Sequence, residues 1–174
     1  MKKVLLFCAF FLGVALCSAG ANPLQFETLS ADFKQIVKSD DAKISYSGDF
    51  SATKEHAVWH YKSPAIKNIF FSLTKVVVIE PELEQAIVTN IKETPNLTAI
   101  LASAKPNKNG IYEASFDDVK YYIELKNEIV SSIKYTDKLG NDVRISFSNV
   151  RKNAPVNEAI FKPVIPKNYD IITQ

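Results

Sequence analysis

Short segments in which apolar and polar residues alternate dominate the sequence after residue 28. Within residues 43–52, for example, Ile44, Tyr46 and Phe50 share one face, as the two-residue period of a strand requires. Proline, glycine, serine and aspartate separate these segments and mark turns between them. We therefore expect about ten strands, at residues 29–38, 43–52, 57–63, 68–73, 75–80, 84–91, 111–116, 119–126, 128–136 and 142–150.

The connections between these predicted strands are short. Neighbouring strands are therefore expected to pair antiparallel in a meander, and a long antiparallel sheet twists and curls toward a barrel. Residues 159–172 are interrupted by proline and are expected to be extended. The pattern predicts one mainly β domain.

One short helix interrupts the strands. Leu97, Ile100, Leu101 and Ala104 recur at helical spacing and form one apolar face in the segment 95–104. Thr94 suits an N-cap, Pro95 suits the first helical position, and the residues from Pro106 to Gly110 end the helix. A helix this short depends on packing for its stability. It either fills a core permanently or covers a space that opens.

Bulky residues are concentrated on one face of the predicted strands. An ordinary hydrophobic core explains such faces, and so does a cavity that binds an apolar ligand. Alternation fixes which residues share a face within each strand, but not which face points inward across the sheet. The residues are Phe33, Tyr46, Phe50, Trp59, Tyr61, Phe71, Ile123, Ile133, Ile145 and Phe147.

The first 21 residues have the pattern of a signal peptide. Lys2 and Lys3 precede an apolar run that is shorter than the ~20 residues of a membrane span, and small residues follow it. Cleavage after Ala21 leaves a domain of residues 22–174, and cleavage after Ala19 is the alternative. Lipid attachment at Cys17 is disfavoured because Leu16 precedes it. We expect a soluble protein of the periplasm, or of the medium.

The mature chain contains neither of the two cysteines, so packing alone must stabilise it. Loss of Lys2 and Lys3 lowers the formal net charge from +2 to 0, and no basic patch suggests nucleic acid.

No motif for catalysis stands out. The sequence lacks a G-x-S-x-G elbow, a P-loop and a G-x-G-x-x-G loop. His56 and His60 have the spacing of a metal pair, but we interpret them as two exposed strand positions without a third ligand. The paired carboxylates at 40–41 and 117–118 are expected in solvated turns. We predict no enzyme activity, no cofactor and no metal site.

Several segments resemble the periplasmic outer-membrane lipoprotein carrier proteins, the LolA family. LSADFKQIV (29–37) is similar to the family's opening strand, IEPELEQAIV (79–88) to its Pro-x-x-Glu-Gln segment, and TPNLTAIL (94–101) to its lid helix. SGDFSA (47–52), VWHYKSP (58–64) and residues 145–172 also resemble family segments. The matches occur in order across residues 29–172.

The resemblance implies an incomplete, half-open antiparallel β-barrel covered by a short helical lid. The barrel would bind the acyl chains of lipoproteins, which an inner-membrane ABC transporter delivers and an outer-membrane acceptor receives. The protein would be a monomer that uses no cofactor. Leu97, Ile100 and Leu101 would belong to the lid. The predicted acyl-chain cavity consists of Phe33, Tyr46, Phe50, Trp59, Tyr61, Phe71, Ile133 and Phe147.

The sequence departs from the family pattern at two places. An arginine that the family uses as a gating latch toward the lid has no counterpart, and Lys54 is the nearest cation, one position out of register. Lysine lacks the rigid fork of arginine. Residues 22–28 are also shorter than the N-terminal helix of the family. The cover is therefore expected to be smaller, or the cavity more open.

Two other functions fit the same residues. A periplasmic domain that senses lipoproteins, or binds apolar ligands in general, could use this scaffold, because a fold does not fix a function. A lipid hydrolase would need a nucleophile with an adjacent base, and no such pair is evident.

Overall fold

One strongly curved sheet contains all the strands of the computed structural model, which describes residues 22–90 and 97–174. The predicted signal peptide, Thr94 and Pro95 lie outside the described residues. The strands are β1 (Thr28–Lys38), β2 (Lys43–Thr53), β3 (Ala57–Ser63), β4 (Lys67–Phe71), β5 (Lys75–Glu80), β6 (Gln85–Asn90), β7 (Lys105–Pro106), β8 (Tyr112–Phe116), β9 (Val119–Lys126), β10 (Ile129–Thr136), β11 (Asp142–Lys152) and β12 (Asp170–Thr173). The helices are α1 (Leu97–Ser103) and two short 3₁₀ turns, η1 (Pro81–Leu83) and η2 (Glu158–Phe161).

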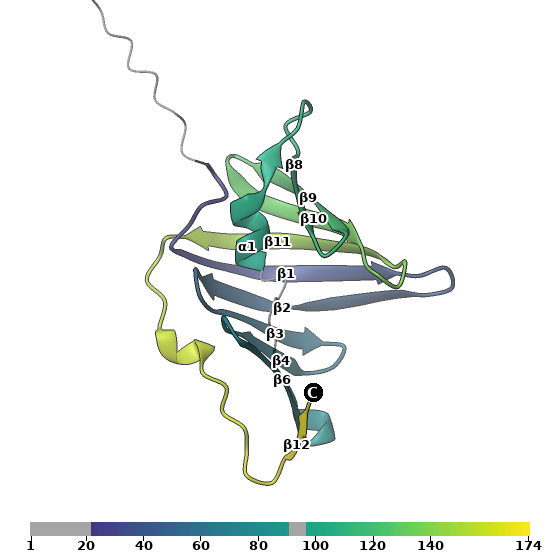
Figure 1. Cartoon of the computed structure of the whole chain (residues 1–174), viewed down its shortest axis with the longest axis vertical. Coiled ribbons are helices and arrows are strands. Elements are labelled where there is room, and N and C mark those ends of the chain that lie inside the picture. Colours follow the sequence, from purple (N-terminus) through teal and green to yellow (C-terminus); the bar gives the residue numbers. More distant parts are fainter. Residues whose placement is uncertain (1–21, 91–96) are drawn as a thin grey trace, which may run out of the picture.

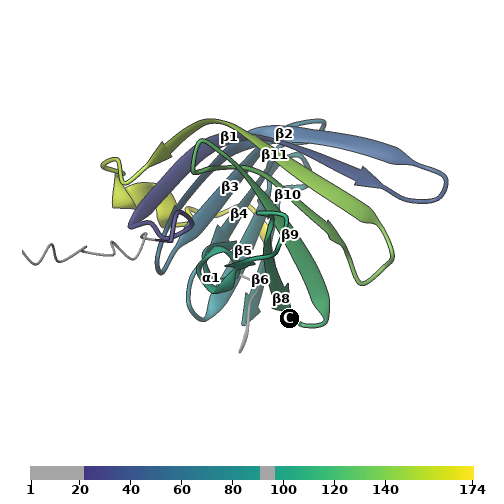
Figure 2. The same cartoon turned by 90° about the horizontal axis from the view of Figure 1, so that it is seen from above.

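The strand order is β12-β6-β5-β4-β3-β2-β1-β11-β10-β9-β8-β7. Two meanders, β1 to β6 and β7 to β11, are joined by antiparallel pairing of β1 with β11. The sheet does not close, so the prediction of a mainly β, half-open barrel with one short helix is confirmed (Figure 1, Figure 2). Figure 2 shows α1 on the concave side of the arch.

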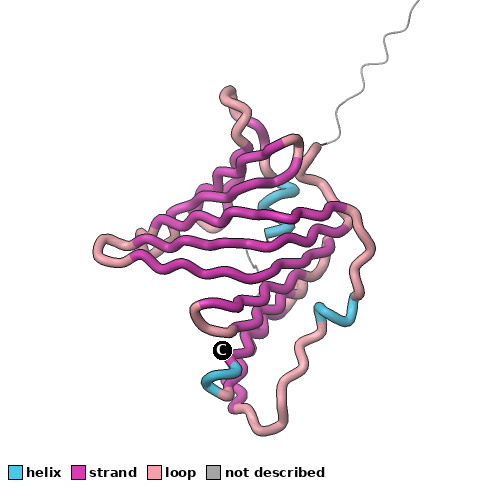
Figure 3. The backbone as a smooth tube through the Cα atoms, turned by 180° about the vertical axis from the view of Figure 1, so that it is seen from behind, coloured by secondary structure: helices cyan, strands magenta, loops and turns pink. Residues whose placement is uncertain are grey.

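The C-terminal segment differs from the prediction. It is not extended throughout, because residues 158–161 form η2, and it ends in β12, which pairs parallel to β6. Phe161 of η2 packs on the convex face of the sheet against Val58, Phe70 and Ile79, in a second and smaller core. Figure 3 shows the loop running from η2 to β12. The segment therefore covers the part of the convex face that is apolar.

Two bulges let strands with irregular spacing keep their apolar residues on the concave face. Val130 pairs with Leu125 and Ile133 with Ile123, although Val130 and Ile133 are three residues apart. The register shift at Ser131 makes this possible, and the Ser131 hydroxyl donates to the carbonyl of Glu124 at 2.9 Å. A similar shift in β11 includes Asn149, which has a positive φ of 51°.

Gly48 lies where β2 and β3 approach each other closely. A Cβ atom there would be 1.8 Å from the carbonyl oxygen of His60 and 3.0 Å from the ring of Phe33. We expect Gly48→Ala to destabilise the fold by about 1–3 kcal/mol, because backbone cannot move aside as a flexible side chain can. Urea unfolding measures the difference. Ser47→Ala, at the exposed neighbouring position, is the control and should change stability by less than about 0.5 kcal/mol. Equal midpoints for the two variants would contradict the close approach.

Candidate functional site: an aromatic cavity beneath a helix

All eight residues of the predicted acyl-chain cavity point to the concave face of the sheet. The register places Phe33 opposite Phe147 and Gly48, Phe50 opposite Trp59, and Trp59 opposite Ile69. Directly paired residues point to the same face of a sheet. The register therefore carries the assignment to the concave face through six neighbouring strands. The residues are Phe33, Tyr46, Phe50, Trp59, Tyr61, Phe71, Ile133 and Phe147.

The rings on this face contact one another in edge-to-face and tilted pairs. The ring of Phe33 lies 4.9 Å from that of Trp59 and 5.0 Å from that of Tyr61, both nearly perpendicular, and the Phe50 ring lies 4.4 Å from Trp59. Such pairs contribute roughly 0.5–1.5 kcal/mol beyond their buried area. Phe50 is only 1% exposed, so this end of the cluster is a packed core rather than open space.

A cavity of about 190 Å³ remains between this aromatic face and α1. In the described conformation, side chains of α1 therefore lie directly against this face. Its lining residues are Gln35, Trp59, Tyr61, Ile69, Phe71, Leu97, Ile100, Tyr121, Ile133, Tyr135 and Ile145.

The helix α1 separates this cavity from a larger, open groove. Leu97 and Ile100 line the cavity, whereas Thr98, Ala99 and Ala102 line the groove. Leu101 is 1% exposed and belongs to the main core. Burial of a leucine stabilises by about 1.5–3 kcal/mol, so a few side chains hold α1 in place. The helix α1 therefore lies where it could cover the cavity and move away from it into the groove.

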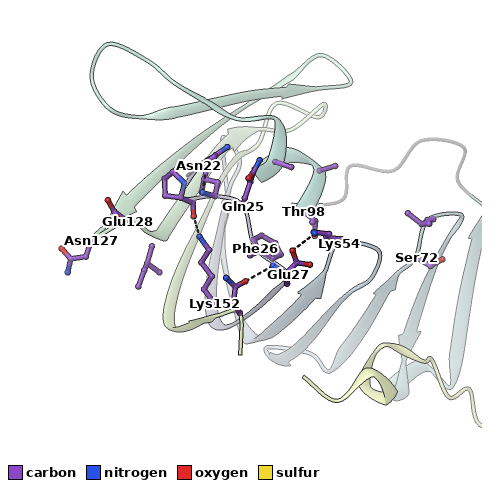
Figure 4. A pocket seen from close by; sticks show the side chains of 17 residues that line it. Asn22, Gln25, Phe26, Glu27, Lys54, Ser72, Thr98, Asn127, Glu128 and Lys152 are labelled. Atoms are coloured by element: carbon purple, nitrogen blue, oxygen red, sulfur yellow. Dashed lines mark hydrogen bonds and ion pairs between the residues drawn. The ribbon is translucent and has the colours of Figure 1, made fainter. Parts of the chain in front are cut away.

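The groove has a volume of about 1090 Å³ and lies beside the N-terminal segment 22–27 (Figure 4). The segment forms no helix, and Leu24 and Phe26 are buried in the main core. Lys152 donates to the carbonyl oxygen of Pro23 at 2.6 Å, and the Asn153 side chain accepts from the amide of Glu27 at 2.8 Å. The end of β11 thus fixes the segment as one wall of the groove.

Lys54, the candidate gating latch, lies in the loop after β2. Its ammonium group is 2.6 Å from the carboxylate of Glu27, and its side chain is 64% exposed (Figure 4). Within the described part of the chain, Lys54 has no hydrogen bond or ion pair with α1. The backbone of Thr53, next to Lys54 in the sequence, does contact α1. The hydroxyl of Thr98 donates to the carbonyl oxygen of Thr53 at 3.2 Å.

We expect Thr98→Val to loosen α1, because valine cannot donate to Thr53. A hydrogen bond of this kind contributes about 0.5–1.5 kcal/mol, so amide hydrogen exchange in residues 97–103 should accelerate by roughly two- to tenfold. Mass spectrometry of the peptide that contains α1 measures this rate. Ser103→Ala is the matched control, because among the described residues the Ser103 hydroxyl bonds only within the helix, to Ile100. An exchange rate no faster than that of the control would exclude this anchor.

Four polar side chains line the cavity or its edge: Gln35, Tyr61, Tyr121 and Tyr135. The phenol of Tyr61 donates to the side-chain oxygen of Gln35 at 2.7 Å. Burial, and then the nearby Tyr135, raise the pKa of Tyr61 far above its ordinary value. Burial and the neighbouring Tyr121 raise the pKa of Tyr135 to about 12. These phenols are therefore neutral donors at physiological pH.

The sequence analysis named Tyr61 but missed the other polar residues. Each follows or precedes a predicted inward residue by two positions: Gln35 after Phe33, Tyr121 before Ile123 and Tyr135 after Ile133. Alternation alone could therefore have placed them on the concave face. Their polar groups, however, give no hydrophobic signal in the sequence.

The two histidines are not paired strand positions as predicted. His56 precedes β3 and its ring stacks at 6.0 Å on Phe161, whereas His60 lies in β3, with Nδ1 2.8 Å from Asp49. Both are half-buried rather than exposed. Burial opposes ionisation of Asp49, but hydrogen bonds from Lys62 and His60 outweigh it and lower the pKa of the carboxyl. Among the described residues, no group of three potential ligands could hold a metal ion.

The paired carboxylates at 117–118 form the two-residue turn between β8 and β9. Asp117 and Asp118 have φ values of 48° and 64°, the pattern of a hairpin turn that matches the twist of the strands. Asp117 also pairs with Lys138. Their role in the fold is structural.

Known proteins resemble this chain along almost its whole length. The model of the family described as outer membrane lipoprotein carrier protein LolA matches residues 24–109. An outer-membrane lipoprotein carrier protein of Campylobacter jejuni is 38% identical over 172 residues, which cover 99% of each chain. The chain belongs to the LolA family.

A second LolA-family relative, the outer-membrane lipoprotein carrier protein of Wolinella succinogenes, is 33% identical and covers 86% of this chain and 90% of its own. Among solved structures, an uncharacterized conserved protein from Thermus thermophilus is similar with a TM-score of 0.55 over 88% of this chain and 94% of its own. At 10% identity this likeness concerns the fold alone. Within residues 22–90 and 97–174, no helix has the length and apolarity needed to cross a membrane.

Proposed function

We propose that this LolA-family chain is a periplasmic carrier that binds the acyl chains of lipoproteins on its concave face. It receives the lipoprotein from an inner-membrane ABC transporter and delivers it to an outer-membrane acceptor. Residues 22–174 form the mature domain after removal of the signal peptide, and they act as a monomer. Transfer requires no covalent step and no cofactor.

The observation that best supports this proposal is the position of α1. It covers an aromatic concave face, and two of its side chains, Leu97 and Ile100, complete the lining of the cavity. An acyl chain gains about 0.8 kcal/mol for each buried CH₂ group, so a carrier must shield nearly all of the hydrocarbon. It must also release it. A short helix held by few contacts can exchange its own side chains for lipid, because local opening costs less than unfolding of the sheet.

The proposed acyl-chain site comprises the eight inward residues of the strands and the lid residues Leu97, Ile100 and Leu101. The groove beyond α1 supplies volume into which the helix can move. Lys54 stays a candidate for gating, since its loop contacts α1 through Thr53.

A release assay tests the function. Purified residues 22–174 are added to spheroplasts, and newly made lipoproteins are sought in the supernatant in complex with the protein. Release that depends on the protein supports the carrier. If no lipoprotein is released but native mass spectrometry finds bound apolar ligands, the chain is a sensor or a general lipid-binding protein instead. Turnover of ester substrates by the purified protein would indicate a hydrolase.

A further inference from the structure

One end of the cavity carries a group of hydrogen-bond donors, although the rest of the lining is apolar. Gln35, Tyr61, Tyr121 and Tyr135 come from β1, β3, β9 and β10. Gln35 pairs with Tyr46, toward the end of β1 where Lys38 meets Lys43, whereas the groove lies at the other end, where Thr28 meets Thr53. The donors therefore lie away from the groove.

These donors are incompletely used within the described part of the chain. The side-chain oxygen of Gln35 accepts from Tyr61, which leaves the amide nitrogen of Gln35 with two protons to donate. Tyr121 and Tyr135 have ring centroids 4.9 Å apart, and neither phenol has a hydrogen-bond partner among the described residues. Of the three groups with a donor to spare, Gln35 has an amide, and Tyr121 and Tyr135 have phenols that remain protonated at neutral pH. The site offers several neutral donors to a ligand.

The donor group itself contains no cation, and the two lysines near it already have other partners. Lys67 lies 5.2 Å from the centre of the Tyr61 ring, over its face, and Lys138 is paired with Asp117. Gln35, Tyr121 and Tyr135 themselves carry no charge. A carboxylate would need a paired cation, and Lys67 would have to leave the face of the Tyr61 ring to supply it, whereas a neutral carbonyl oxygen needs only a donor. The ligand group that fits is an ester or amide carbonyl at the end of a hydrocarbon chain.

We propose that Gln35, Tyr121 and Tyr135 form a subsite for the ester or amide carbonyl oxygens of acylated ligands. The hydrocarbon extends from this subsite toward Leu97 and Ile100, under α1. The inference rests on the proposed function, because it requires acyl chains to occupy the cavity. It adds that the protein recognises the ester or amide linkage of an acyl chain as well as its hydrocarbon.

Two probes that differ only in their carbonyl groups test the subsite. One is dioctanoylglycerol, with two ester carbonyls, and the other is the matching dioctyl ether. We expect the wild-type protein to bind the ester about tenfold more tightly, as two hydrogen bonds of modest strength would give. In the double variant Tyr121→Phe/Tyr135→Phe, the preference should fall to about twofold or less, while the affinity for the ether is unchanged.

A neighbouring tyrosine provides the matched control. Tyr122 lies on the opposite face of β9 and is 41% exposed, so Tyr122→Phe should keep the full preference for the ester. If all affinities of the double variant fell together, the phenols would be structural, and the proposal would be wrong. Gln35→Met offers an independent variant, and it should also lower only the ester affinity.

Further probes separate the possible ligands. Octanoate should bind more weakly than the ester, and tighter binding of octanoate would overturn the assignment to neutral carbonyls. A lipopeptide with a diacylglyceryl cysteine has the same ester groups, so the double variant should weaken its binding too. Equal wild-type affinity for ester and ether would exclude the subsite even if lipoproteins are released from spheroplasts. If neither lipid binds and no lipoprotein is released from spheroplasts, the carrier function itself is excluded.

Discussion

Replacing Leu97 or Ile100 by aspartate is expected to reduce lipoprotein uptake by about tenfold or more. Both side chains are more than 90% buried and line the cavity beneath α1, so a carboxylate there would have to be desolvated without a partner. The helix would then not close over the acyl chains. The amount of lipoprotein that the variant releases from spheroplasts measures the effect.

Circular dichroism should show that the sheet of these variants remains folded, because its strand pairs do not depend on α1. The matched controls are Ala99→Asp and Ala102→Asp, which add the same charge to the exposed side of the same helix. They should release lipoproteins almost as well as the wild type. Normal uptake by both cavity-facing variants would remove α1 as a lid.

The largest effect on stability is expected for Phe50→Ala, at about 3–5 kcal/mol. The Phe50 ring is 1% exposed, lies 4.4 Å from Trp59 and lies 6.3 Å from Phe147. Its removal leaves a hole at the junction of β2, β3 and β11 that neighbouring rings cannot fill without leaving their own positions. Since small domains are stable by only about 5–15 kcal/mol, urea unfolding should reveal a large loss.

Ile44→Ala is the control for Phe50→Ala. Ile44 lies on the same strand and the same face, six residues away, but it is 44% exposed. Its truncation should cost less than about 1 kcal/mol. If Phe50→Ala lowered the free energy of unfolding no more than Ile44→Ala does, the aromatic cluster would be loosely packed around Phe50.

The histidine pair illustrates why spacing alone misleads. Positions 56 and 60 are separated by an even number, so a continuous strand would place both rings on one face. The strand begins only at Ala57, so His56 lies outside it; both rings lie on the convex side, but His56 is covered by Phe161, a residue more than a hundred positions later. A contact with so distant a segment leaves no trace in the local pattern of the sequence.

The sequence by itself determined ten of the twelve strands, the apolar face of each, and the helix; β7 and β12 were not predicted. These features follow from periods of two and about 3.6 residues, which are set by the local geometry of the backbone. Alternation therefore places Phe50 with Tyr46, and helical spacing places Leu97 with Ile100 and Leu101, without any tertiary contact. The ordered resemblance to the LolA family predicted that the sheet stays open.

Only the tertiary structure decided how these elements meet. The pairing of β1 with β11 joins residues about 115 positions apart, as in Phe33 with Phe147, and the parallel pairing of β12 with β6 is likewise nonlocal. The bulge at Ser131 exists because Val130 and Ile133 both find apolar neighbours on the concave face. Such pairings depend on the closure of long loops and on the sum of many contacts, and no single segment encodes them. For the same reason, the group of donors at Gln35, Tyr121 and Tyr135 exists only once the two meanders have joined.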